Sequence, residues 1–150
     1  MDMNSFSVNY RFTSNFNRLS FGERMDVANL YLIEGILVIK IVDKVYFEED
    51  VALLEFWILL DRWLKNIESE NIRAFRYYTL EMDDNIPLFS LIPYQDKFLI
   101  EVIEVKEMAA NLLPQDKVIE AFKNVHSHLY NDIQNHYGIY IDDYLDKVPF

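Results

Sequence analysis

The sharpest arrangement of chemically active side chains in this sequence is His128, Asp132 and His136, which are spaced four residues apart. If this segment is helical, the spacing places all three on one face, and neutral imidazole and carboxylate groups are suitable ligands for zinc. Eight residues of helix span about 12 Å, however, so one ion reaches only two of the three without a ligand from another element. A solvated polar face is therefore the main interpretation, and a metal site is the alternative.

Covalent catalysis and nucleotide chemistry find little support in the residue types. The chain has no cysteine and no Gly-x-Ser-x-Gly motif, and Ser127 stands between two histidines whose side chains would point in other directions on a helix. Its three glycines are isolated, so they cannot form a phosphate-binding loop. We therefore expect a protein that is not an enzyme and uses no cofactor. Carboxylate catalysis in a tyrosine-lined pocket remains a further hypothesis.

The negative charge of the chain is concentrated after its first third. Residues 1–47 hold five acids and five bases, whereas residues 48–150 hold twenty acids and nine bases, so the whole net charge of −11 belongs to the second region. A charge imbalance of this kind bears on association more than on fold. It favours a basic protein partner, and it disfavours nucleic acid, because phosphate contacts need clustered lysine and arginine.

Acids and tyrosines of the second region define a candidate binding surface. Tyrosine is enriched at interfaces because it offers a large apolar body and a polar tip. The predicted partner-binding residues are Asp83, Asp84, Tyr94, Glu101, Glu104, Tyr140, Asp142, Asp143 and Tyr144. If they gather on one side of the molecule, they form an acidic patch interleaved with tyrosines. Ordinary solubility is the alternative explanation of the charge.

Length and composition predict one ordered domain over residues 1–150. Half of the residues are hydrophobic, which is enough for a substantial core, and few glycines and prolines leave no room for a flexible linker. The first residues lack the basic and apolar regions of a secretory signal, and no apolar run reaches the ~18 residues of a membrane span. We therefore expect a cytoplasmic protein that does not associate with membranes.

Strand patterns dominate the first third of the chain. Residues 6–12 alternate between apolar and polar side chains, which predicts a strand with one buried face. Residues 27–33 and 36–42 are two runs rich in β-branched and apolar side chains. The glycine between them, Gly35, can adopt a positive φ, so these runs predict a β-hairpin.

The next element is predicted to be an amphipathic helix. The run before it either ends as a central strand or continues into residues 45–47. The acids at residues 48–50 are suited to a helix start, and apolar residues follow at helical spacing from 53 to 67. We expect Trp57 and Trp63 to pack in the core, with a ligand slot or contact surface as the alternative. The polar residues expected largely on the opposite face are Glu55, Asp61, Arg62, Lys65 and Asn66.

The second half predicts a meander followed by a long helix. Residues 75–82, 86–92 and 97–105 are strand candidates separated by good turn residues. A helix is predicted from 114 to 135, and the acidic tail at 137–150 is a candidate edge strand. The predicted fold class is α+β: an antiparallel sheet of about six strands, formed by a meander and a hairpin, with two main α-helices packed on it.

The sequence also resembles a group of known proteins. An acidic chain of this length without cysteine, with Leu54-Glu55-Phe56 followed by Trp63-Leu64, resembles uncharacterised small proteins of Gram-positive bacteria that look like the immunity proteins of polymorphic toxin systems. The tryptophan–glycine signature of the best-known immunity superfamily is absent. The resemblance implies a stoichiometric inhibitor of a toxin and carries over no functional residue.

Charge and resemblance together lead to the main functional hypothesis. A toxin that acts on nucleic acid is basic where it binds phosphate, and an acidic inhibitor can cover that site while long-range attraction speeds association. We therefore expect an immunity protein that neutralises a basic toxin, such as a nuclease, through its acidic, tyrosine-rich surface. The alternative is a structural or adaptor subunit of a homo-oligomeric or hetero-oligomeric assembly, such as a homodimer.

Overall fold

Seven strands, two long helices and two short helical segments make up the described part of the chain. The computed structural model describes residues 5–14, 29–68, 72–78, 87–102 and 112–147. In chain order the elements are β1 (Phe6–Phe12), α2 (Asn29–Leu32), β2 (Glu34–Ile41), β3 (Lys44–Ala52), α3 (Leu53–Glu68), β4 (Phe75–Tyr77), β5 (Phe89–Tyr94), β6 (Lys97–Val102), β7 (Leu112–Pro114), α4 (Gln115–Tyr137) and the 3₁₀ helix η1 (Ile141–Tyr144).

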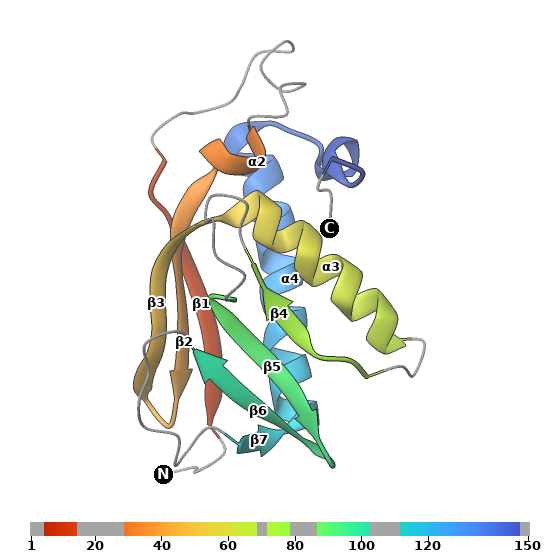
Figure 1. Cartoon of the computed structure of the whole chain (residues 1–150). Helices are drawn as coiled ribbons and strands as arrows, with labels where there is room; N and C mark the ends of the chain where they lie inside the picture. The colour runs from red at the N-terminus through yellow and green to blue at the C-terminus, as the bar shows by residue number, and fades with distance from the viewer. Residues whose placement is uncertain (1–4, 15–28, 69–71, 79–86, 103–111, 148–150) are drawn as a thin grey trace.

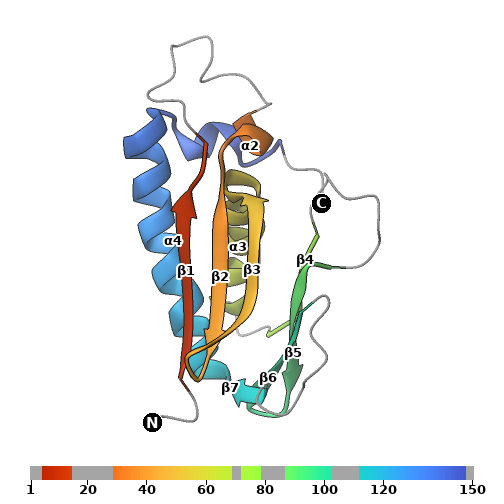
Figure 2. The ribbon, with the colours of Figure 1, turned by 90° about the vertical axis from the view of Figure 1, so that its left-hand side faces the viewer.

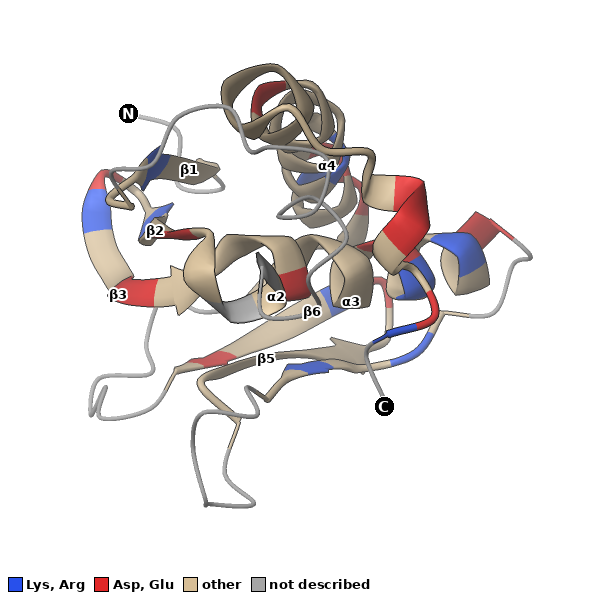
Figure 3. Cartoon of the chain, turned by 90° about the horizontal axis from the view of Figure 1, so that it is seen from above, with Lys and Arg blue, Asp and Glu red and all other residues tan. Residues whose placement is uncertain are grey.

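The strands form two antiparallel sheets that share one helical layer. Sheet A has the order β1-β2-β3, and sheet B has the order β4-β5-β6-β7. Both sheets lie against α3 and α4 (Figure 1), and a view from above places them on two adjacent sides of this helix pair (Figure 3). The predicted α+β class with two main helices is confirmed. The strands, however, are divided between two sheets instead of forming one.

The predicted first strand is confirmed, whereas the predicted first hairpin is wrong. The part of the 27–33 segment that the structure describes contains the helical turn α2 instead of a strand. The hairpin of sheet A instead joins β2 to β3 through a turn at Val42 and Asp43 with φ values of 49° and 63°, so the strand of residues 36–42 ends there and does not continue into 45–47. A two-residue turn with positive φ at both positions matches the twist of the flanking strands, which explains why the chain reverses here.

Gly35 is required for a close approach and not for a turn. It lies within β2, opposite Phe12 of β1, and a Cβ atom added to it would collide with the carbonyl oxygen of Arg11 and with the side chain of Leu53. β1 and the start of α3 therefore lie so close to the backbone of Gly35 that there is no room for a side chain at this position.

Replacing Gly35 with alanine should lower the free energy of unfolding by about 1–3 kcal/mol, the usual cost of forcing extra atoms into a packed interior. Because one of the clashing atoms belongs to the backbone, a side-chain rotation cannot relieve the clash. Urea unfolding of the variant tests this expectation. Asn9→Ala, on the exposed face of β1, is the control and should change stability by less than about 0.5 kcal/mol. Equal stability of Gly35→Ala and the wild type would contradict the packing described here.

The acidic triplet Glu48, Glu49 and Asp50 lies in β3 and does not begin a helix, so that prediction is wrong. β3 is an edge strand of sheet A, and all three carboxylates are exposed. Charged side chains on an edge strand hinder unwanted pairing with other chains. The same residue types favour a helix N-terminus, which is why the sequence pattern was misleading. The helix itself begins at Leu53.

α3 is buried on more sides than its sequence suggests. Trp57 and Trp63 are buried, so their predicted place in the core is confirmed. Glu55 and Asp61 were expected on the solvent face, and this expectation is wrong, because both are buried as well. The cause is the number of neighbours: α3 contacts α2, α4, both long strands β2 and β3, and β4.

The second half of the chain follows its predicted order with shorter strands. β4, β5 and β6 form the expected meander, β7 adds a fourth strand, and the predicted residues 79–82, 86 and 103–105 lie outside the described part. α4 ends at Gly138, whose φ of 70° and N–H bond to the Gln134 carbonyl form a left-handed cap. In the tail, the described residues form η1 and no edge strand. No described helix is long and apolar enough to cross a membrane.

Candidate functional site

A cleft opens where α3, α4 and the segment around η1 meet. Its volume is about 430 Å³, and it is lined by Trp57, Asp61, Lys65, His126, Ser127, Tyr130, Asn131, Asp142 and Leu145. Trp57, Asp61 and Lys65 follow one another at intervals of four residues, so they form one row along α3. The ionisable groups of the lining are the carboxylates of Asp61 and Asp142, the ammonium group of Lys65 and the imidazole of His126.

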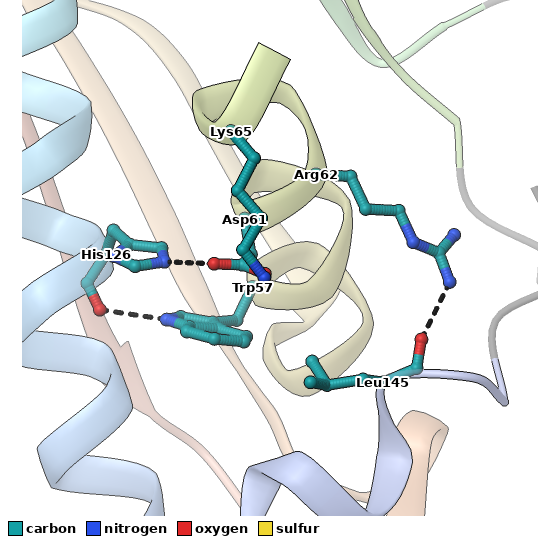
Figure 4. A network of polar contacts seen from close by, with 6 residues as sticks. All are labelled: Trp57, Asp61, Arg62, Lys65, His126 and Leu145. Carbon is teal, nitrogen blue, oxygen red and sulfur yellow. Dashed lines mark hydrogen bonds and ion pairs between the residues drawn. The ribbon is translucent and has the colours of Figure 1, made fainter. Parts of the chain in front are cut away.

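Trp57 and His126 form the floor of this cleft (Figure 4). The Trp57 Nε1–H donates a 2.8 Å hydrogen bond to the His126 carbonyl oxygen, and the two rings are stacked with centroids 4.7 Å apart. The ring of Tyr130, one turn further along α4, lies 5.3 Å from that of Trp57. Three aromatic rings from two helices are thus held together at the base of the cleft.

Asp61 connects this floor to the cleft wall. Its side chain contacts His126 Nε2 through one carboxylate oxygen and Lys65 Nζ through the other, each at 2.8 Å (Figure 4). The residue is only 7% exposed, and these two partners compensate the cost of burying a carboxylate. The hydrogen bond to Asp61 and its charge raise the pKa of Lys65 above the ordinary lysine value, and the more distant charge of Asp142 acts in the same direction.

Two hydrogen bonds hold the C-terminal segment against the helices. Arg62 donates to the Leu145 carbonyl oxygen at 2.9 Å (Figure 4), and the backbone N–H of Ile141 donates to the Gln134 side chain at 3.1 Å. These bonds place η1 at the mouth of the cleft. As a result, Asp142 lines the cleft, while Asp143 lies beside it on the surface.

The arrangement is suited to receiving a cationic side chain. The half-buried ring of Tyr130 lines the cleft, and aromatic faces attract cations by about 0.5–2 kcal/mol. Asp142 offers an exposed carboxylate at the mouth. The cleft therefore has the groups to bind a lysine or arginine. Separately, an imidazole held by a carboxylate, as in the His126–Asp61 pair, is also found in general acid–base catalysis.

The described partner-binding candidates do not gather in one place. Tyr140 is 66% exposed, and Asp142 and Asp143 are exposed on η1. Tyr94, 57% exposed, lies at the β5–β6 turn, at the opposite end of the molecule from η1 (Figure 1), and the exposed Glu101 lies further along β6, opposite Ser90 of β5. The remaining acids, Asp83, Asp84 and Glu104, lie outside the described residues.

Tyr144 is wrong as a surface contact, because it is only 2% exposed. A 3₁₀ helix has three residues per turn, so Ile141 and Tyr144 share one side and both are buried, while Asp142 and Asp143 point away from the core. Of the acids predicted for the surface, the structure describes Glu101 on β6 and Asp142 and Asp143 on η1. The acids of β3, which were not part of that prediction, lie on the side of the molecule opposite to η1 (Figure 3).

The structure does not bring the metal candidates together. Within the described ranges, no three histidine or acidic side chains are placed to hold a metal ion. His136 stacks on the ring of Phe12, and Asp132 accepts a hydrogen bond from the Tyr10 hydroxyl. Asp132 and His128 instead line a second concavity, a groove of about 720 Å³ between β1 and α4.

Alkaline titration should reveal the Tyr10–Asp132 contact. Burial and the hydrogen bond to Asp132 raise the pKa of Tyr10 above its ordinary value. The stabilisation is therefore complete below about pH 10, where unfolded tyrosine titrates, and is lost as the pH rises towards the folded value. We expect Tyr10→Phe to be less stable than the wild type by about 0.5–1.5 kcal/mol at pH 7, with the difference shrinking above about pH 10. Urea unfolding at several pH values measures it.

The control for this prediction is the same substitution in an Asp132→Asn background. There the charge that favours the neutral phenol is absent, so the pH dependence of the difference should be smaller. A difference that stays constant up to about pH 11 in both backgrounds would contradict the contact.

Of the residues that form the cleft, sequence reasoning identified Asp142 as a binding residue. Trp57 was assigned to the core with a ligand slot or contact surface as the alternative, Asp61 to the solvent face, and His126 was considered only as a neighbour of Ser127. The pairing of Asp61 with His126 joins residues 65 positions apart, so no local pattern indicates it. The one available signal is the row of a tryptophan, an acid and a lysine at intervals of four residues on α3.

Comparison with known proteins identifies the family and goes no further. A family described as "Domain of unknown function (DUF7878)" matches residues 8–135, which include α3, nearly all of α4 and both sheets apart from the first two residues of β1. No curated protein and no solved structure matches the chain. The matched range covers most of the chain, and the chain therefore belongs to this DUF7878 family.

Proposed function

We propose that this protein is a stoichiometric inhibitor that binds a basic protein, and that it serves as an immunity protein against a toxin. It acts by occlusion and without catalysis, in the cytoplasm of the cell that the toxin would damage. The observation that carries the proposal is the cleft between α3, α4 and η1. There an aromatic floor and an exposed carboxylate converge on a space large enough for one basic side chain.

The interface is centred on the mouth of the cleft. A lysine or arginine of the partner enters over Tyr130, whose ring packs against the buried Trp57, and its charge meets Asp142. The positive charge of Lys65 in the lining is offset by Asp61, to which its Nζ is bound. The exposed Tyr140 beside η1 adds apolar contact area at small entropic cost. The partner thus inserts one basic anchor and packs around it.

The overall charge supports rapid capture. A net charge of −11 attracts a basic protein over several ångströms, and such steering raises association rates to about 10⁸ M⁻¹s⁻¹ or more at low salt. Salt weakens this attraction because the Debye length falls to about 8 Å at physiological ionic strength. An inhibitor of a lethal protein benefits from this speed, since each uncaptured molecule is harmful.

Affinity measurements with charge-neutralised variants test the proposal. The candidate partners are basic proteins captured at low salt and those encoded next to this gene. For the double variant Asp142→Asn with Asp143→Asn, we expect the dissociation constant of the complex to rise at least tenfold. The matched control, Glu48→Gln with Glu49→Gln, removes the same charge from β3 and should change the constant by about twofold through the long-range field alone.

Three outcomes contradict the proposal. The first is that no basic protein binds at any salt concentration. The second is an equal loss of affinity in both double variants, which would mean that the overall charge of the protein, and not the cleft, determines the affinity. The third is a dimer of this chain whose formation does not depend on salt, which would favour the subunit or adaptor role.

A further inference from the structure

The two edges of sheet A are protected to different degrees. β3, one edge, carries the three exposed acids of residues 48–50, and its pairing with β2 contains a register shift. Both features discourage another strand from pairing. β1, the other edge, has seven residues in regular register with β2, no proline, and Arg11 as its single charged side chain. One edge of this sheet is thus closed to additional strands, and the other has none of these protections.

The hydrogen-bond pattern shows which backbone groups β1 presents outward. The N–H of Val42 bonds to the Ser5 carbonyl, and the N–H of Thr13 bonds to the Glu34 carbonyl, so the odd-numbered residues of β1 bond to β2. The N–H and C=O groups of the even-numbered residues therefore face the opposite edge. Among the described residues no strand pairs with that edge. These residues are Phe6, Val8, Tyr10 and Phe12.

The groove between β1 and α4 runs alongside these outward groups. Part of α4 lies beyond the outer edge of β1 (Figure 2), so a strand added to β1 would lie over this helix. The groove is lined by Ser5, by residues 6–10 of β1 and by mostly polar residues of α4, and its volume is about 720 Å³. The helix residues that line it are Lys117, Glu120, Ala121, Asn124, Val125, His128 and Asp132.

We propose that the outer edge of β1 and this groove bind an extended, basic segment of a partner protein, which joins sheet A as a fourth strand. Backbone hydrogen bonds to the outward groups of β1 provide the affinity, as in other cases of strand addition. The carboxylates of Glu120 and Asp132 select basic side chains on the face of the segment that meets α4.

Charge favours this occupant over a second copy of the chain. Two copies would each bring a net charge of −11 to the contact, whereas a basic segment complements it. Glu120 and Asp132 are twelve residues apart on α4, which corresponds to about 18 Å of helix. A strand rises about 3.3 Å per residue, and side chains on one face recur every second residue, so the two basic residues of the segment are about six positions apart.

A synthetic peptide of ten residues tests the inference. It alternates threonine and valine and carries lysine at positions 2 and 8. We expect it to bind, and to protect the amides of the even-numbered residues of β1 from hydrogen exchange in NMR spectra. N-methylation of the alternate amides that face β1 should weaken binding at least tenfold. N-methylation of the other alternate set keeps composition and charge and should weaken it far less.

Protein variants complete the experiment. The double variant Glu120→Gln with Asp132→Asn should bind the peptide at least fivefold more weakly. The control, Glu48→Gln with Glu49→Gln on β3, should change the affinity for the peptide by no more than about twofold through the long-range field. The inference is overturned if the peptide does not bind, if the two N-methylated peptides bind equally, or if binding leaves the amides of β1 unprotected. It is also overturned if the protein forms a concentration-dependent dimer that excludes the peptide. The inference shares with the proposed function only a basic partner. Because Asp142→Asn with Asp143→Asn should leave peptide binding unchanged, the failures of the two proposals are distinguishable.

Discussion

Replacing Phe122 with alanine should lower the free energy of unfolding by about 3–5 kcal/mol, a large part of the stability of a domain of this size. Phe122 is completely buried on α4, and its ring lies between the two sheets. The centroids of Phe6 in sheet A and Phe89 in sheet B lie 5.8 and 6.1 Å from it, respectively, and that of Trp63 on α3 lies 6.2 Å away. Its removal opens a cavity where four elements meet.

The same variant tests whether the two sheets form one cooperative unit. Tryptophan fluorescence reports mainly on α3, and far-ultraviolet circular dichroism reports on the whole chain. If the core is continuous, both probes should shift together to lower urea concentration in Phe122→Ala. Lys123→Ala, exposed on the same helix, should leave both unchanged. Separate transitions for the two probes would contradict a single domain over residues 1–150.

Replacing Trp57 with alanine should have a comparable effect, about 3–5 kcal/mol, and should also dismantle the cleft. The side chain is buried, it donates a hydrogen bond to the His126 carbonyl, and its ring stacks on His126 and packs against Tyr130. Trp57→Phe keeps most of the buried area and loses the hydrogen bond, so it should cost about 0.5–1.5 kcal/mol more than the loss of area alone.

These variants separate structure from binding. Trp57→Phe is expected to remain folded and to bind the basic partner more weakly, because the base of the cleft loses the hydrogen bond that ties Trp57 to α4. Thermal and urea unfolding measure the first effect, and the dissociation constant measures the second. A loss of less than about 1 kcal/mol in Trp57→Ala would mean that α3 and α4 do not depend on this contact.

Local signals predicted the elements whose boundaries depend on neighbours in sequence. The apolar–polar alternation of residues 6–12 became β1, and proline and glycine mark the two ends of α4, at Pro114 and Gly138. Signals that depend on distant residues were misread. Gly35 was interpreted as a turn glycine because its close neighbours, Arg11 and Leu53, are 24 and 18 positions away.

The candidate site shows the same limit. Asp142 and Asp143 were identified because exposed acids in a tail are visible in the sequence. Asp61 was not, because its burial depends on His126, which only the packing of α3 against α4 brings within 2.8 Å. Tyr144 was misassigned because a 3₁₀ turn, which the sequence did not indicate, rotates it into the core. Charge and residue type were readable from the sequence, but orientation was not.

The most direct test of the central claim is a titration of the basic partner's toxic activity with the purified protein. The wild type should abolish that activity at a one-to-one molar ratio. The variant Asp142→Lys with Asp143→Lys should require at least a tenfold excess, and Glu48→Lys with Glu49→Lys should remain close to the wild type. A partner that binds yet keeps its full activity, or equal losses in the two charge-reversed variants, would contradict inhibition through the cleft.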